Sequence, residues 1–270
     1  MPTQNQPLRL KGRIRHSLVY WCYAPYWTPR QMCQIARDLG CKSIEVIDVE
    51  YWPLLKEFGL TCALAGSHSF VHGLNNPANH EPCLAKLREQ IDHSAAFGCP
   101  NVITFTGNRD GMSDNVGMAN TVAALKKIAP YAERNNVTLC LEMLNSRVAT
   151  DMKGHPGYMG DHMDWCVEAV KRVGSPRVKV LFDFYHVQIM DGDVITRMEQ
   201  YIDYIGHIHT AGVPGRFELT GRQEINYEPI MQALAELKYE GYVGHEFFVT
   251  QPNAEFALRK LREAVELCDV

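Results

Sequence analysis

The chain alternates short apolar, β-branched runs with longer amphipathic stretches, and eight such pairs follow one another along its 270 residues. Runs of this kind predict buried strands, which we expect over residues 15–21, 43–49, 60–65, 101–106, 138–144, 178–184, 205–210 and 242–248. Helices are predicted between them, and the first is capped by Thr28, starts with Pro29 and ends at Gly40. Strands that alternate with helices of this length form a parallel sheet, and eight repeats favour its closure into a barrel.

The length of the chain agrees with this architecture, because a (β/α)8 barrel usually has about 250 residues. We therefore predict an α/β fold with a single (β/α)8 TIM barrel, the catalytic domain, over residues 15–270, preceded by a flexible N-terminal segment over 1–14. Residues 190–204, before the seventh strand, are predicted to be helical. An open doubly wound sheet is the alternative, although no GxGxxG motif follows the first strand to support a dinucleotide crevice.

The net charge and the cysteine content limit which partners and which cellular compartment are expected. A net charge of -4 and a pI near 6.3 give no general attraction to phosphate backbones, so a small molecule is a better expectation than a nucleic acid. No apolar run has the length of a signal peptide or of a membrane helix, so no membrane partner is expected. Nine cysteines without a CxxC pair are typical of a reducing compartment, which predicts a cytoplasmic protein. The sequence is also compatible with a homo-oligomer.

Four metal-compatible side chains stand at the ends of four consecutive predicted strands. Glu142 and Asp183 end the fifth and sixth apolar runs, and His209 and Glu246 end the seventh and eighth. The carboxyl ends of barrel strands meet at one face, where three carboxylates repel one another unless a cation neutralises them. Oxygen ligands with one imidazole suit Mg²⁺ or Mn²⁺, so we predict one divalent metal ion held by these residues. Singly, each residue is more often a satisfied structural group, but four neighbouring strands weaken that explanation.

Polar residues just beyond the predicted strands are candidate substrate-binding residues. His186 follows Asp183 by three positions and can form a hydrogen bond with a substrate hydroxyl. Arg216 lies on a glycine-containing loop after the seventh strand, where it can clamp a carboxylate or a hydroxyl group. His68 and His72 lie in the loop after the third strand and are candidate pocket walls. A solvent-facing or packing role is the alternative for each of them.

Five stretches together resemble a known family, the xylose-isomerase-like barrels of sugar isomerases and epimerases, and within it most closely the hydroxypyruvate isomerases. The resemblance extends over nearly the whole chain after Arg15 and depends on residues 141–147 (LEMLNSR), 182–192 (FDFYHVQIMDG), 206–216 (GHIHTAGVPGR), 221–227 (GRQEINY) and 241–247 (GYVGHEF). It implies that Glu142, Asp183, His209 and Glu246 are metal ligands, that the two glutamates are also the catalytic acid/base pair, and that His186 and Arg216 contact the substrate.

The resemblance implies an enzyme that acts on a small hydroxy-carbonyl substrate. The reaction would be proton transfer through an enediolate, as in an intramolecular oxidoreductase of the aldose–ketose isomerase type, with hydroxypyruvate giving tartronate semialdehyde. Hydroxypyruvate isomerases usually carry glutamine at the position of His209, whereas ketose 3-epimerases carry histidine, so a 3-epimerase of free ketoses is the alternative. A three-zinc endonuclease of the same superfamily would need further histidine and aspartate ligands. A barrel that retains the metal as a binding module is a third alternative, which the two intact glutamates disfavour.

Overall fold

Eight parallel strands form one sheet in the computed structural model, which describes residues 7–270. They are β1 (Arg15–Val19), β2 (Ser43–Glu45), β3 (Leu64–Ala65), β4 (Asn101–Thr104), β5 (Thr138–Glu142), β6 (Val178–Asp183), β7 (Ile205–Thr210) and β8 (Tyr242–His245). The strand order is β2-β1-β8-β7-β6-β5-β4-β3. Strands that are neighbours in the sheet therefore also follow one another in the sequence, except that the first strand, β1, lies beside the last, β8. The predicted parallel sheet is confirmed.

The two edge strands, β2 and β3, also meet. The backbone N–H of Ile44 donates to the carbonyl of Thr61 at 3.1 Å, and that of Val46 donates to the carbonyl of Leu64 at 2.8 Å. A parallel bridge joins Ser43 to Thr61 at the same place. These bonds bring the sheet round into a nearly closed barrel, which confirms the prediction of a single (β/α)8 fold over the open doubly wound alternative.

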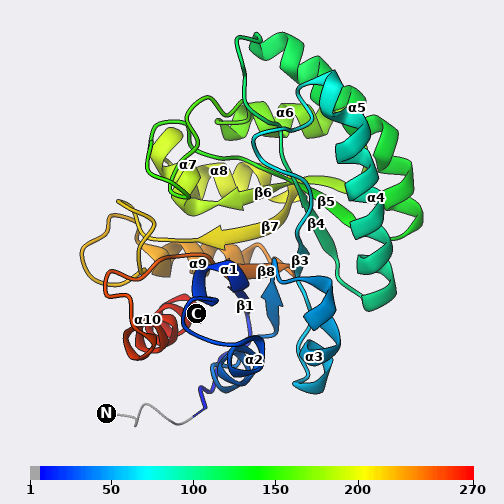
Figure 1. Cartoon of the computed structure of the whole chain (residues 1–270). Helices are drawn as coiled ribbons and strands as arrows, with labels where there is room; N and C mark the ends of the chain where they lie inside the picture. The colour runs from blue at the N-terminus through cyan, green and yellow to red at the C-terminus, as the bar shows by residue number, and fades with distance from the viewer. Residues whose placement is uncertain (1–6) are drawn as a thin grey trace.

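Helices surround the strands on the outside of this barrel (Figure 1). In Figure 1, α4 and α5 cover the right side, whereas α2 and α10 lie below β1 and β8. None of the helices within residues 7–270 combines the length and the apolar character that crossing a membrane requires. The α-helices are α1 (Tyr20–Tyr23), α2 (Pro29–Asp38), α3 (Trp52–Glu57), α4 (His80–Phe97), α5 (Asp114–Arg134), α6 (Met163–Val173), α7 (Phe184–Met190), α8 (Val194–Tyr201), α9 (Tyr227–Glu236) and α10 (Ala254–Cys268).

The interior of the barrel has an apolar half and a polar half. Alternate residues of a strand point to opposite faces, so Cys140 shares the inner face with Glu142, and Leu181 shares it with Asp183. Cys140 and Leu181 belong to a small buried cluster that also contains Leu64. Across the barrel, the inner positions of β1, β2, β7 and β8 carry buried polar residues or glycine, namely Ser17, Ser43, Glu45, His207, His209 and Gly244. Polar chemistry is therefore concentrated on one side of the barrel.

The predicted helical region over 190–204 begins later than expected, because Met190 ends α7 and the next helix, α8, begins only at Val194 and continues as a 3-10 helix over Ile202–Tyr204. Helix α7 begins directly after β6, where the Asp183 carboxylate accepts a hydrogen bond from the backbone N–H of Tyr185 at 2.8 Å. Gly192 and Asp193 then have φ angles of 66° and 47°, a left-handed conformation that ends a right-handed helix. Strands β1, β2, β4, β5, β6 and β8 also end earlier than predicted, since the chain turns into loops or helices as soon as the apolar core is left, whereas β3 ends at Ala65 as predicted but begins only at Leu64.

Part of the predicted N-terminal segment, residues 1–6, lies outside the described residues. In the described part, the backbone N–H of Leu8 donates to the carbonyl of Asp38 at 2.9 Å, and that of Lys11 donates to the Asp269 carboxylate at 2.7 Å. Ile14 is buried against the core. Residues 7–14 therefore pack over the amino-terminal end of the barrel, remote from the strand ends that carry the predicted metal ligands.

A buried histidine of β1 is expected to make the stability of the fold depend on pH. His16 is fully buried, with its Nδ1 atom 3.1 Å from Nε2 of His245 on β8 and its Nε2 atom 4.0 Å from Oδ1 of Asp269 after α10. Burial lowers the pKa of His16 from 6.5 to about 4, although the charge of Asp269 opposes the shift. Between these pH values the unfolded chain binds a proton at His16 and the folded chain does not, so acidification lowers the free energy of unfolding.

The expected loss is on the order of 3 kcal/mol in total and about 2 kcal/mol by about pH 5. Urea unfolding at about pH 7.5 and about pH 5 measures it. His16→Gln should reduce the difference between the two unfolding free energies by about 2 kcal/mol, whereas His93→Gln on the exposed face of α4 should leave it unchanged. An equal pH dependence in His16→Gln and the native protein would contradict the assignment.

Candidate metal centre

The four predicted metal ligands meet at the carboxyl end of the barrel. Glu142 ends β5, Asp183 ends β6, His209 lies in β7, and Glu246 directly follows β8. One ligand atom from each lies within 4.8 Å of all the others, and all four residues are buried. Parallel pairing produces this arrangement, because Asp183 stands opposite His209 in the register of β6 and β7.

The donor set fits a small divalent cation. The Nδ1 atom of His209 lies 2.9 Å from Oε2 of Glu246 and 3.8 Å from Oε1 of Glu142. Around a cation with octahedral coordination at about 2.1 Å, neighbouring ligand atoms are about 3 Å apart and opposite ones about 4 Å apart. Three carboxylates and one imidazole at these separations can therefore hold such an ion with little rearrangement.

Arg216 reaches this group of carboxylates from the loop after β7. It is buried, its Nη2 atom lies 3.2 Å from Oδ2 of Asp183, and the same atom donates to Oε2 of Glu246. Its Nη1 atom donates to the carbonyl of Met152 at 2.7 Å, which ties the loop after β7 to the loop after β5. The guanidinium carbon also lies 5.5 Å from the ring centre of Trp21. Arg216, a predicted substrate contact, is thus held beside the predicted metal ligands by ion pairs, by a hydrogen bond to a backbone carbonyl and by stacking on Trp21.

His186 is the second predicted substrate contact that the structure brings to the centre. It is fully buried on α7, and its Nδ1 atom accepts a hydrogen bond from the backbone N–H of Asn145 at 3.0 Å. The proton of this imidazole is therefore on Nε2, which lies 3.5 Å from Oδ2 of Asp183. Within residues 7–270, this Nε2 atom has no hydrogen-bond partner. His186 is thus a preoriented donor beside the carboxylates.

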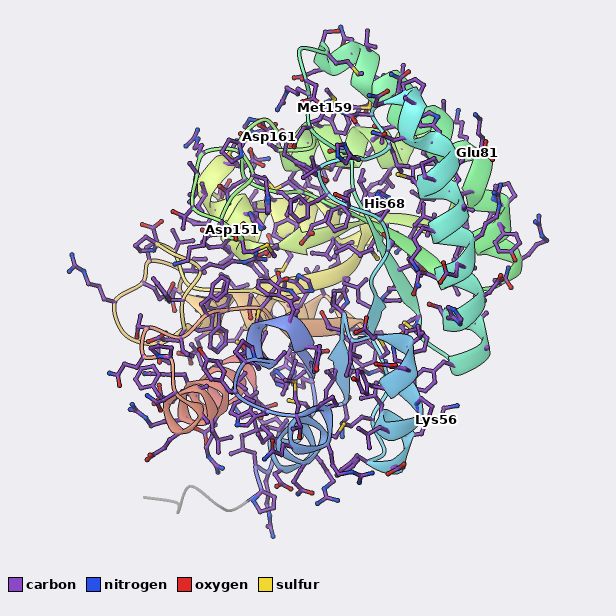
Figure 2. All side chains as sticks on the ribbon, in the orientation of Figure 1. Lys56, His68, Glu81, Asp151, Met159 and Asp161 are labelled. Atoms are coloured by element: carbon purple, nitrogen blue, oxygen red, sulfur yellow. The ribbon has the colours of Figure 1, made fainter. Side chains whose placement is uncertain are left out.

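A cavity of about 270 Å³ opens beside the candidate centre. His68 lines it from the loop after β3, and its Nε2 atom lies 2.8 Å from Oγ1 of Thr104. In Figure 2, His68 lies on the cyan loop near the middle of the molecule, and Asp151 lies to its left on the loop between β5 and α6. His72, the other predicted wall residue, is exposed, and the structure does not bring it to the cavity. The residues lining the cavity are Trp21, Val46, Gly66, Ser67, His68, Phe70, Ile103, Phe105, Glu142, Leu144, Met152, His155, Arg216 and Glu246.

The two glutamates of the centre have different electrostatic environments. Burial raises the pKa of Glu142 to about 7, and the negative charge of Glu246 adds to the rise. Burial also disfavours the charged form of Glu246, but Arg216 and His209 outweigh it and lower the pKa to about 2. Two carboxyl groups with separated pKa values suit a pair that gives and takes a proton.

Three further residues complete the surroundings of the centre, two of which, His155 and Glu45, were not predicted from the sequence. The indole Nε1 of Trp21 donates to Oε1 of Glu246 at 3.0 Å, and the ring of His155 closes the cavity beside Phe70. Glu45, at the end of β2, lies behind His209 and accepts a hydrogen bond from its Nε2 atom. The signal for Glu45 was present in the sequence, because it is a lone carboxylate within the apolar run of the second predicted strand.

The barrel and its site define a class, the (β/α)8 barrels with a cluster of carboxylates and histidine at the carboxyl ends of the strands. Within this class, the chain belongs to the family of xylose isomerase-like TIM barrels, whose model matches residues 33–267. This confirms the family that the sequence motifs indicated.

Relatives of this chain are named as isomerases. It is 26% identical to a putative hydroxypyruvate isomerase of Homo sapiens over 242 residues, which are 88% of this chain and 79% of the relative. It is 28% identical to the hydroxypyruvate isomerase of Escherichia coli over 187 residues, 68% of either chain. It is 39% identical to the 2-oxo-tetronate isomerase of Cupriavidus necator over 119 residues, which are 44% of this chain and 43% of the relative.

Solved structures with the same fold include sugar epimerases. D-psicose 3-epimerase from Clostridium cellulolyticum, solved with D-tagatose, has a TM-score of 0.77 and 19% sequence identity, with 94% of this chain and 98% of that chain covered. The IOLI protein with a binding zinc atom has a TM-score of 0.75 and 13% identity, with 94% and 98% covered. At these identities the likeness shows the fold that the chains share.

Proposed function

We propose that this protein is a metal-dependent isomerase of a small hydroxy-keto acid, and that it converts hydroxypyruvate into tartronate semialdehyde. The observation that carries the proposal is the pair of buried glutamates, Glu142 and Glu246, at one candidate metal centre with Asp183 and His209. Relatives named as hydroxypyruvate isomerases support the choice of substrate. Mg²⁺ and Mn²⁺ are the proposed metals, because both prefer oxygen-rich ligand sets.

The proposed reaction moves one proton between neighbouring carbons of the substrate. A divalent cation at this centre would polarise the carbonyl and hydroxyl oxygens of hydroxypyruvate and so make the C–H at carbon 3 more acidic. One glutamate takes this proton, and an enediolate is left on the substrate. A proton is then returned to carbon 2, while the hydroxyl proton passes from the oxygen of carbon 3 to that of carbon 2. Carbon 3 becomes the aldehyde, and no co-reactant is consumed.

Arg216 and His186 give this substrate two fixed contacts. The buried guanidinium of Arg216 is one wall of the cavity, where a substrate carboxylate would find a charged and preoriented partner. The free Nε2–H of His186 is directed toward the same carboxylates and would donate to a substrate oxygen. His68 also lines the cavity, and since burial lowers its pKa to about 4, it acts there as a neutral imidazole.

A ketose 3-epimerase is the second candidate, and His209 is the observation that favours it. The resemblance associates histidine at this position with ketose 3-epimerases. In that reaction one glutamate removes a proton from carbon 3, and the other returns a proton to the opposite face of the same carbon. The apolar wall of the cavity, which contains Phe70, Phe105 and Leu144, would suit a neutral sugar.

The two candidates are separated by assaying the purified protein with Mn²⁺ or Mg²⁺ against hydroxypyruvate, 2-oxo-tetronate and free ketoses. We expect turnover of hydroxypyruvate, observed as formation of the aldehyde, to exceed turnover of ketoses at least tenfold, because a carboxylate gains the ion pair with Arg216. Turnover of ketoses alone would establish the epimerase instead. Absence of turnover in a protein that binds no divalent cation would overturn both.

A further inference from the structure

Glu45 is a fully buried carboxylate with two histidine partners. Its Oε1 atom lies 2.7 Å from Nε2 of His209 and 2.8 Å from Nε2 of His207. A carboxylate in the interior of a barrel is costly unless hydrogen-bond donors meet it, and the two imidazoles provide them for Oε1, whereas Oε2 has no hydrogen-bond partner among the described residues. The side chain of Glu45 is therefore held in one place by residues of β7.

This contact crosses the interior of the barrel. Glu45 lies on β2 and His209 on β7, and β1 and β8 stand between them in the sheet. On those two strands the inner positions below the contact are Ser17 and Gly244, which pair with each other, and Gly244 also pairs with His209. A Cβ atom at position 244 would lie only 2.4 Å from Oε1 of Glu45 and 2.8 Å from Cδ2 of His209. The hydrogen bond is thus sterically feasible because residue 244 is glycine.

The contact determines which nitrogen of His209 carries a proton. A carboxylate only accepts hydrogen bonds, so Nε2 of His209 must carry the hydrogen that lies between it and Glu45. The Nδ1 atom faces Glu246 at 2.9 Å and Glu142 at 3.8 Å, and without a cation these two carboxylates favour a second proton on it. A bound cation would replace that proton and take the Nδ1 lone pair, while the proton on Nε2 stays with Glu45. A metal ligand requires this state of an imidazole, with one nitrogen bare and the other bonded to an acceptor that fixes the ring.

His207 completes the arrangement from the same strand. It stands two positions before His209, so both rings point into the barrel, where they pack edge to face at 5.0 Å. Both Nε2 atoms lie at hydrogen-bonding distance from the same oxygen of Glu45, which fixes the position of that oxygen. Separations of 2.7 and 2.8 Å are those of hydrogen bonds, whereas two ligands of one small cation lie about 3 Å or more apart. The geometry therefore favours a hydrogen-bonded triad over a second metal site.

We propose that Glu45 is a positioning residue of the candidate metal centre, which holds the Nε2 proton of His209 so that Nδ1 is offered to the cation. Gly244 provides the space for this contact. The inference rests on the proposed function, because that function requires a cation at the centre. Glu45 itself would not touch the cation or the substrate.

The binding of Mn²⁺ to the full-length protein, measured by calorimetry and by electron paramagnetic resonance, tests the proposal without an activity assay. Loss of a hydrogen-bonded partner of a metal ligand typically weakens metal binding by about 10- to 100-fold. We expect a Kd about tenfold higher in Glu45→Gln, which retains an acceptor but loses the charge, and a larger rise in Glu45→Ala. Glu218→Gln is the matched control, since Glu218 is a buried glutamate that bonds only to Thr250 among the described residues. Its Kd should equal that of the native protein.

A double-mutant cycle separates positioning from a general effect on the fold. If Glu45 acts through His209, then Glu45→Gln should change the Kd less than about twofold once His209 is already replaced by alanine. Full additivity of the two substitutions would overturn the proposal. Gly244→Ala should weaken Mn²⁺ binding in the same direction, because its Cβ atom would displace both the Glu45 carboxylate and the ring of His209.

The remaining outcomes distinguish this inference from the proposed function. A native protein that binds one Mn²⁺, together with a Glu45→Gln variant that binds it equally well, would refute the role of Glu45 and leave the function intact. Two ions per native chain, one of them lost in Glu45→Gln, would make Glu45 a ligand and also refute the role. A native protein that binds no divalent cation would remove the proposed function and the inference together.

Discussion

Replacing Glu142 or Glu246 by glutamine is expected to lower kcat about 10³-fold or more, with each variant folded like the native protein. General acid–base catalysis alone contributes about 10²- to 10⁴-fold, and a glutamine cannot accept a proton at neutral pH. Both side chains also belong to the group of four that can hold a cation, so each substitution removes a charged donor as well. Steady-state kinetics at saturating Mn²⁺ measures the effect.

Two further measurements test whether the loss of kcat is caused by the loss of proton transfer. Glu263→Gln on α10 is the matched control, because Glu263 bonds to Thr220 and Lys260 away from the centre, and it should retain native kcat. In deuterated water, the variant that retains the glutamate which removes the substrate proton should still exchange this proton for deuterium, although it forms no product. Native kcat in either variant would contradict the assigned roles, and equal loss of exchange in both would show that the glutamates act as one unit.

The four predicted ligands could be recognised in the sequence because each one interrupts or ends an apolar run. In a parallel barrel the carboxyl ends of all strands lie at the same face. Residues at these ends are therefore expected to be close together even when they are more than a hundred positions apart in the sequence. Glu142 and Glu246, for example, are 104 positions apart in the sequence, and their ligand atoms lie within 4.8 Å of each other. The strand pattern thus predicted both the fold and its central group of side chains.

The loops could not be predicted in the same way, because no periodic pattern fixes where a loop side chain points. His68 and His72 lie four positions apart in one loop, yet His68 lines the cavity and His72 is exposed. Arg216 adopts a φ of 58°, which non-glycine residues rarely do, and its direction is set by Met152 and by the carboxylates it contacts. Such contacts join distant loops and leave no local trace in the sequence.

Glu45 shows a different limit. Its position in an apolar run resembles that of Glu142, but its partner His209 is 164 positions away and its contact depends on the absence of a side chain at Gly244. Glu45 ends the second strand and so lies outside the four consecutive strand ends that carry the predicted ligands. The three-dimensional register of β1, β8 and β7 is what relates these residues, so only the structure reveals that the candidate ligand has a second, buried carboxylate behind it.

Removal of divalent cations is expected to abolish turnover and to lower the stability of the protein. In the proposed reaction the cation polarises the substrate, so chelation followed by gel filtration should reduce kcat to background, and added Mn²⁺ or Mg²⁺ should restore it. The cation would bind only the folded chain, since the four candidate ligands are brought together by four different strands. At a concentration about 100 times the Kd it would raise the free energy of unfolding by about 2.7 kcal/mol, which thermal unfolding detects as a Tm several degrees higher.

The set of ligand atoms also predicts which cations restore activity. Ca²⁺ prefers six to eight oxygen ligands at about 2.3 to 2.6 Å, and four close protein ligands with one imidazole favour a smaller ion, so Ca²⁺ should restore less activity than Mn²⁺. Asp183→Asn should reduce the rise in Tm that Mn²⁺ causes, because it removes a ligand charge while the loop contacts of Arg216 to Met152 remain. Full turnover after chelation, confirmed by elemental analysis to leave no divalent ion, would mean that the carboxylates and Arg216 perform the chemistry alone, and the metal-dependent reaction proposed for this barrel would have to be abandoned.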